Sequence, residues 1–76
     1  MNAERRSRID KLIADLIALQ SEAEAIRDDE QDAYDAMPEG IQDSERGQKA
    51  LEAIYNLDES CDAFDTMIDA LKASKE

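Results

Sequence analysis

Histidine and tryptophan are absent from this chain of 76 residues, which has one cysteine, one proline and two glycines. A single cysteine cannot form an intrachain disulfide, and without histidine Cys61 has no companions for a zinc site. Nor has Cys61 a base to activate it, so we expect a reduced, buried thiol of the core. Disulfides and metals commonly stabilise so short a chain, and their exclusion leaves self-association.

Catalytic and metal chemistry could come only from carboxylates. Acid–base catalysis by paired carboxylates needs a concave, partly dry site, which a thin helical chain does not offer. Asp28, Glu30, Asp32 and Glu39 have the spacing of a calcium loop, but Ala33 stands where that loop requires glycine. We therefore expect no enzyme, no metal and no cofactor.

Acidic residues outnumber basic ones by 20 to 9, for a net charge of −11. Such a charge repels nucleic acids and anionic membranes and favours a basic protein partner. The charge is uneven, at +2 over residues 1–11, −10 over residues 12–45 and −3 over residues 46–76. No apolar run is long enough for a membrane span or a signal peptide, so we expect a cytoplasmic protein.

Apolar or small residues recur at spacings of three and four in two segments, as in helices that pack together. The first series is Ile9, Leu12, Leu16, Leu19, Ala23, Ile26, Glu30, Ala33 and Met37. The second is Gly47, Ala50, Ile54, Leu57, Cys61, Phe64, Ile68 and Leu71. We predict an all-α fold, with residues 1–76 forming one domain and helices at about 3–36 and 44–73.

Residues 37–43 contain Pro38 and Gly40, which predict a turn that ends the first helix and reverses the chain. A short connection makes the helices antiparallel neighbours. One register then pairs every layer of the two series, including Leu16 with Phe64 and Ile26 with Ile54. Asp43 or Ser44 is expected to cap the second helix, and Gly47 to let the helices approach closely.

Four apolar residues fall outside this register, on one flank of the predicted hairpin: Ile13, Ile17, Leu51 and Tyr55. They could widen the core within the hairpin. Because a two-helix hairpin has no second layer, we favour self-association through them, giving a homodimer that forms a four-helix bundle.

Aspartates form two further columns along the predicted helices. One is made of Asp28, Asp32 and Asp35, with Asp29 beside it, and the other of Asp58, Asp62, Asp65 and Asp69. Like charges at these spacings disfavour a helix, so local stability does not explain them. They are either a solvated face or an electronegative surface for a basic protein, including one that normally holds nucleic acid.

The region around the turn resembles a group of small, uncharacterised helical proteins encoded in bacteriophages and prophages. The resemblance covers about residues 27–71: the acidic Asp29-Glu30-Gln31, a Pro38-Glu39 turn, a Ser44-Glu45-Arg46 step and an amphipathic helix through 53–59. It implies a phage or mobile-element origin and carries no activity. The leading hypothesis is a protein–protein interaction module that binds a host or phage protein. Alternatives are an acidic inhibitor of a defence complex, of anti-restriction or anti-CRISPR type, and a structural or assembly adaptor.

Overall fold

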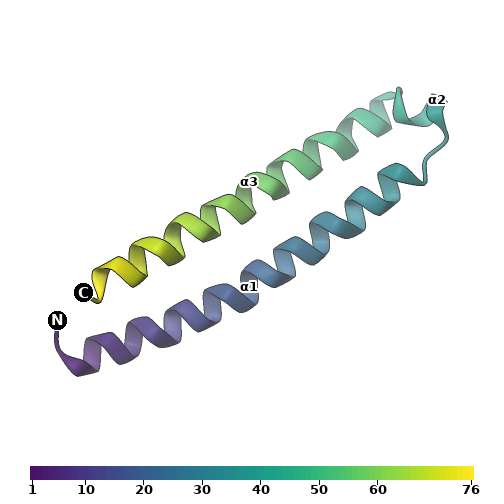
Figure 1. Cartoon of the computed structure of the whole chain (residues 1–76). Helices are drawn as coiled ribbons and strands as arrows, with labels where there is room; N and C mark the ends of the chain where they lie inside the picture. Colours follow the sequence, from purple (N-terminus) through teal and green to yellow (C-terminus); the bar gives the residue numbers. More distant parts are fainter.

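The computed structural model describes residues 1–76 and contains helices and no strands (Figure 1). The elements are α1 (Ala3–Asp35), the single-turn α2 (Glu39–Gln42) and α3 (Glu45–Ser74). Helices α1 and α3 lie side by side and antiparallel, so the two chain ends meet at one end of the molecule and α2 closes the other. The predicted all-α class is confirmed, and the two long helices lie within a residue or so of their expected bounds.

Helix α1 begins and ends where its local sequence dictates. The Asn2 side chain accepts a hydrogen bond from the backbone N–H of Arg5 at 2.8 Å, which satisfies one of the donors left unpaired at a helix N-terminus. Pro38 follows the other end and disfavours helical backbone at the residue before it. The helix accordingly stops at Asp35, ahead of the proline.

The connection differs from the simple turn expected over residues 37–43, because α2 occupies its centre. The Pro38 carbonyl accepts hydrogen bonds from the N–H groups of Ile41 and Gln42, at 2.8 and 3.0 Å. The prediction that Gly40 reverses the chain was wrong, since Gly40 lies within α2 and no glycine has a positive φ. The reversal is made by the two ends of α2 instead, where proline fixes φ at the entry.

Helix α2 packs closely on the first turn of α3. A methyl group on Gly47 would lie 2.6 Å from Gln42 Cα and nearer still to the Gln42 carbonyl. The Gln42 side chain donates to the backbone oxygen of Tyr34 at 3.0 Å, which ties α2 to α1 as well. Ser44 occupies the N-cap position of α3, but its hydroxyl donates back to Ile41 and caps nothing. Gly47 therefore permits close approach, with α2 as the neighbour.

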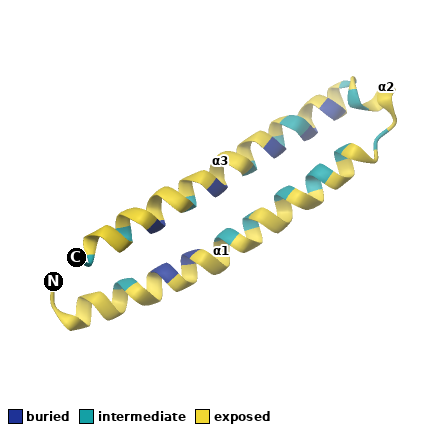
Figure 2. Ribbon diagram, viewed as in Figure 1, coloured by how far each residue is buried: buried dark blue, intermediate teal, exposed yellow.

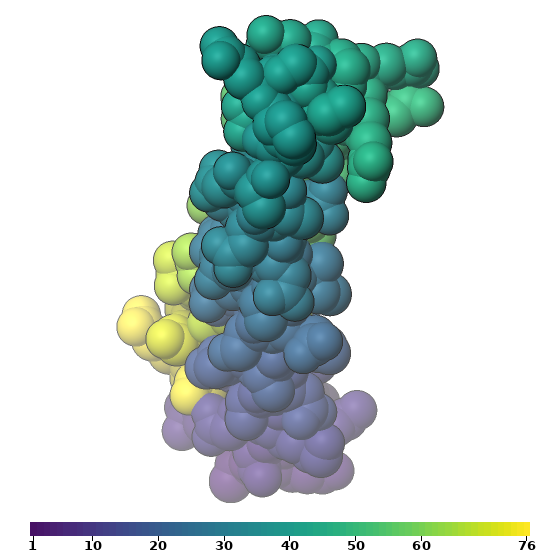
Figure 3. Space-filling model, turned by 90° about the vertical axis from the view of Figure 1, so that its right-hand side faces the viewer, coloured from purple at the N-terminus to yellow at the C-terminus, as the bar shows by residue number.

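The molecule is a rod one layer thick. Its Cα atoms span 58 × 15 × 12 Å, and their radius of gyration is 17.3 Å, against about 11 Å for a compact chain of this length. Buried residues line only the inner sides of the two long helices, and none is fully buried (Figure 2). The view from the turn end shows how narrow the rod is (Figure 3). The core is thus a single seam.

The inner side of α3 matches its predicted series. Its members are all buried or half-buried: Gly47, Ala50, Ile54, Leu57, Cys61, Phe64, Ile68 and Leu71. The Cys61 thiol is free and buried in this seam. Phe64 and Leu71 pack on a cluster of Ile13, Leu16 and Ile68, so Leu16 and Phe64 share one part of the core.

The inner side of α1 is turned from the predicted one. Every second member of the predicted series is buried or half-buried as expected: Ile9, Leu16, Ala23, Glu30 and Met37. The inward-facing residues that alternate with them are Ile13, Gln20, Arg27 and Tyr34. The predicted Leu12, Leu19 and Ile26 are 47%, 56% and 49% exposed. In each case the next residue in the sequence, Ile13, Gln20 or Arg27, takes the inward place. Because adjacent helical residues point about 100° apart, the buried stripe of α1 is rotated about the helix axis from the predicted one. Ala33, also predicted to lie in the seam, is exposed.

Candidate interaction surfaces

Polar contacts made by three side chains accompany the rotation of α1 and define one broad face of the hairpin. Gln20 Nε2 donates to the Cys61 carbonyl at 3.1 Å and to Asp65 at 2.7 Å. Arg27 pairs with Asp58 at 3.0 Å, and Lys75 pairs with Asp10. Long polar side chains can pack their stems in a seam while their ends reach partners at its edge. We call this side the polar face.

Arg27 is the most engaged of these groups. Its guanidinium also contacts Asp28, at 3.3 Å, and the side chain is partly shielded from solvent, with 28% of it exposed. That shielding acts to lower the pKa of Arg27, but the bonds to Asp28 and Asp58 outweigh it and raise the pKa above its ordinary value. Arg27 is therefore charged throughout the physiological range, and it holds an acidic residue of each long helix at the edge of the seam.

The opposite broad face carries the residues that the rotation leaves outside. Leu12, Leu19 and Ile26 are seven residues apart, so they form one straight column along α1, beside the seam. Met67, also half-exposed, lies on α3 on the side of the seam away from Asp58 and Asp65. We call this side the apolar face.

The four residues predicted for self-association do not share one flank. Ile13 is only 7% exposed and belongs to the core, because it replaces Leu12 opposite Ile68. Ile17 is 46% exposed on the polar face, and Leu51 is half-buried. Tyr55 lies well exposed on the outside of α3. The prediction was wrong in placing Ile13 outside the seam. Self-association through Ile17, Leu51 and Tyr55 stays a prediction, and it competes with the apolar-face dimer proposed below.

The eight aspartates predicted to bind a basic partner are all exposed: Asp28, Asp29, Asp32, Asp35, Asp58, Asp62, Asp65 and Asp69. They do not form two uniform columns. Half of them contact Arg27 or a glutamine, and the side chains of the other half, Asp29, Asp32, Asp62 and Asp69, make no hydrogen bond or ion pair. Only Asp28 and Asp58 are neutralised, because the glutamine amides that bind Asp35 and Asp65 carry no charge. The second set is the part of this acidic surface that no other side chain engages.

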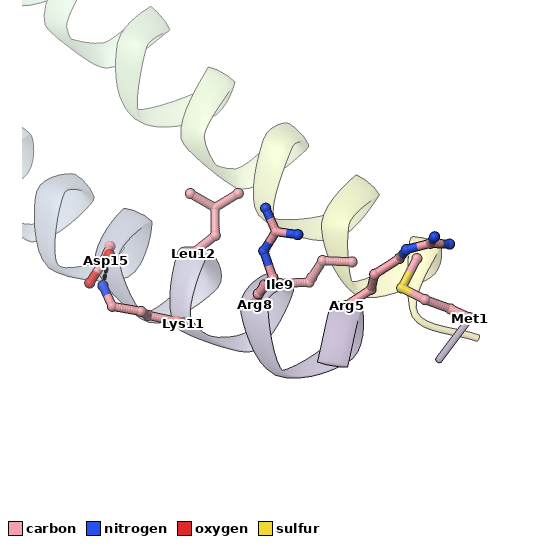
Figure 4. A pocket seen from close by; sticks show the side chains of 7 residues that line it. All are labelled: Met1, Arg5, Arg8, Ile9, Lys11, Leu12 and Asp15. Carbon is pink, nitrogen blue, oxygen red and sulfur yellow. Dashed lines mark hydrogen bonds and ion pairs between the residues drawn. The ribbon is translucent and has the colours of Figure 1, made fainter. Parts of the chain in front are cut away.

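A groove of about 520 Å³ lies at the N-terminal end of α1, where it continues the apolar face. Its walls combine three apolar and three basic side chains with one acid: Met1, Ile9, Leu12, Arg5, Arg8, Lys11 and Asp15. Arg5, Arg8 and Leu12 rise from successive turns of the helix (Figure 4). The hydrogen bond from Lys11 to Asp15, 2.9 Å long, and their attraction raise the pKa of Lys11. Because Lys11 neutralises Asp15, the groove's remaining charge is the pair of arginines.

Nothing in the structure gathers ligands for a metal ion, since no three Asp, Glu or Cys side chains converge. None of the helices has the length and hydropathy to cross a membrane. Comparison with protein-family models, with curated proteins and with solved structures finds no match to this chain. The surfaces of the hairpin that could bind a partner are therefore the apolar face, the groove and the aspartates that no other side chain engages.

Proposed function

We propose that this chain is a small acidic protein–protein interaction module without catalytic activity, and that its apolar face is the surface that binds. The observation that supports this is the straight column of Leu12, Leu19 and Ile26, with about half of each side chain exposed. Aliphatic side chains aligned along a helix are typical of a surface that packs on another helix. Following the resemblance at the turn, the partner would be a host or phage protein in a bacterial cytoplasm.

The energetics are compatible with a homodimer that forms a four-helix bundle. Burying the exposed half of a leucine or isoleucine is worth roughly 0.7–1.5 kcal/mol. With Met67, each copy offers four such residues, so two apolar faces together would gain roughly 6–12 kcal/mol. That gain is comparable with the 4–15 kcal/mol or so that association costs. The hairpin would thus gain in the dimer the second layer that it lacks alone.

Capture from a bacterial lysate, with identification by mass spectrometry, tests the binding surface. The double variant Leu19→Asn/Ile26→Asn places amides on the apolar face, and we expect it to lose the captured protein. Ile17→Asn is the matched control, because Ile17 is exposed to a similar extent on the polar face. Equal capture by the wild type and the double variant would contradict the proposal, provided circular dichroism shows both to be helical.

An acidic inhibitor of a nucleic-acid-binding protein is the second candidate, and the free aspartates favour it. Asp62 and Asp69 are seven residues apart on α3 and therefore lie on the same side of that helix, where both are exposed and neither makes an ion pair. Attraction of this kind weakens steeply with salt, whereas apolar packing does not. Asp62→Asn/Asp69→Asn should release a partner held by charge and leave unchanged one held by the apolar face. A captured protein that binds equally at low and high salt would exclude this mode.

A further inference from the structure

We propose that the N-terminal groove is the docking site for the acidic half of α1 from a second copy of this chain. This rests on the proposed function and specifies how the dimer forms. The two α1 helices would cross antiparallel, with a two-fold axis beside Leu19. Each groove would then receive Ile26 of the other copy next to Leu12.

The column on α1 is self-complementary about its centre. Leu12 and Ile26 lie seven residues to either side of Leu19, about 10.5 Å along the helix axis. A two-fold axis at Leu19 therefore brings Leu12 of one copy to Ile26 of the other, twice. Leu19 is also the midpoint of α1, which runs from Ala3 to Asp35. Two helices related in this way overlap along their whole length.

Charge selects the antiparallel arrangement. Residues 1–11 carry +2 and residues 27–35 carry −4, so antiparallel helices place opposite charges together and parallel helices place like charges together. Arg8 falls level with residues 29 and 30 of the other copy, of which Asp29 has the exposed side chain. The side chains of Arg8 and Asp29 are both exposed, and neither makes an ion pair within the hairpin. Each is therefore available to a second copy without loss of an existing contact.

The middle of the interface is the least favourable part. Glu22 of the second copy approaches Asp15, and two carboxylates repel each other. Asp15 is already held by Lys11 at 2.9 Å, which neutralises it within its own helix. The attraction between the ends of the two helices, repeated by symmetry, then dominates.

The available area suits a dimer. The broad face of the rod is 58 Å long and 15 Å wide, so its projected area is roughly 870 Å², the product of the two, against about 800 Å² per partner in a stable interface. The groove lies within this face and supplies a recess for the second copy's side chain. A face of standard size, apolar at its centre and charged at its ends, has the composition of a specific interface.

Sedimentation equilibrium of the purified chain is the first test, and we expect a dimer at micromolar concentration. Leu19 meets its own copy at the axis, so Leu19→Asn should raise the dimer dissociation constant roughly 10- to 100-fold. Ile17→Asn, on the polar face, should leave it unchanged. A loss of the dimer in Ile17→Asn but not in Leu19→Asn would assign the interface to the polar face and overturn the proposal.

A charge exchange tests the orientation of the two helices. Arg8→Glu and Asp29→Arg should each weaken the dimer, by roughly 3- to 30-fold since every substitution acts twice. The double variant Arg8→Glu/Asp29→Arg restores the attraction with its sign reversed and should recover the wild-type dissociation constant. Two single effects that simply add in the double variant would refute the pairing.

Failure of this inference and failure of the proposed function have different outcomes. A wild-type chain that stays monomeric and helical at about 100 µM, well above the expected dissociation constant, would overturn the dimer. If that monomer still captures another protein through Leu19 and Ile26, the apolar face binds a different partner and the proposed function survives. If nothing is captured and no dimer forms, both proposals are wrong.

Discussion

Replacing Gly47 by alanine tests how the turn is held together. In a helix, alanine is intrinsically favoured over glycine by about 1 kcal/mol. At Gly47 the added methyl would lie 2.6 Å from Gln42 Cα and closer to the Gln42 carbonyl, which is backbone and cannot turn aside. Overpacking of this kind typically costs about 1–3 kcal/mol, and here α2 must also move away from α3. We expect net destabilisation despite the gain in helix propensity.

Gly40→Ala is the matched control, because Gly40 is also helical and has nothing within 4 Å of the position of a new Cβ. It should stabilise the fold by about 0.4–1 kcal/mol, because alanine lowers the conformational entropy of the unfolded chain. For a domain of this size 1 kcal/mol corresponds to about 4–8 °C in melting temperature. The melting temperature, measured by circular dichroism, should fall for Gly47→Ala and rise for Gly40→Ala. Two upward shifts would refute the close contact between α2 and α3.

A double-mutant cycle locates the strain. If Gly47→Ala pushes α2 away, the Gln42 side chain loses its bond to the Tyr34 carbonyl. Gln42→Ala should then destabilise the wild-type chain but add little to Gly47→Ala. Fully additive effects of the two substitutions would show that α2 stays in place and that the methyl is accommodated elsewhere.

Three further outcomes are expected. Phe64→Ala should destabilise the chain by about 3 kcal/mol, measured by urea unfolding, because Phe64 packs on the main cluster of so small a core; a loss below about 1 kcal/mol would show that the seam has repacked. Alkylation of Cys61 should be slow in the folded state and fast in denaturant, since the thiol is buried. The raised pKa of Lys11 means that its bond to Asp15 contributes at neutral pH and is lost as pH rises through that pKa; NMR titration should show a lower pKa for Lys11 in Asp15→Asn.

The sequence predicts α3 better than α1 for a definable reason. Every inward position of α3 is apolar or small, so only one stripe can face a partner. In α1 two stripes compete, one through Leu12, Leu19 and Ile26 and one through Ile13, Gln20 and Arg27. Hydropathy favours the first, and the hairpin uses the second.

The choice between these stripes depends on residues of the other helix. Gln20 and Arg27 are acceptable at the seam because Asp65 and Asp58 stand ready to accept their hydrogen bonds. A pattern of apolar residues within α1 does not contain that information. The candidate surface was missed for the same reason, since exposure of Leu19 and Ile26 follows from the position of Gln20 and Arg27 in the seam. One signal in the sequence could have identified this surface. It is a long polar residue next to an apolar one on α1, such as Gln20 or Arg27, at the same level along the hairpin as an aspartate of α3.

Both chain ends lie at the same end of the rod, and the turn lies at the other. In an antiparallel dimer the two pairs of ends would therefore point in opposite directions, separated by approximately the 58 Å length of the hairpin. Such a dimer would act as a rigid spacer. A group attached to the chain ends of one copy would be held about one hairpin length away from the same group on the other copy. Fluorescent labels on the ends of two copies would accordingly report less energy transfer than labels near Leu19, which lie close together at the two-fold axis.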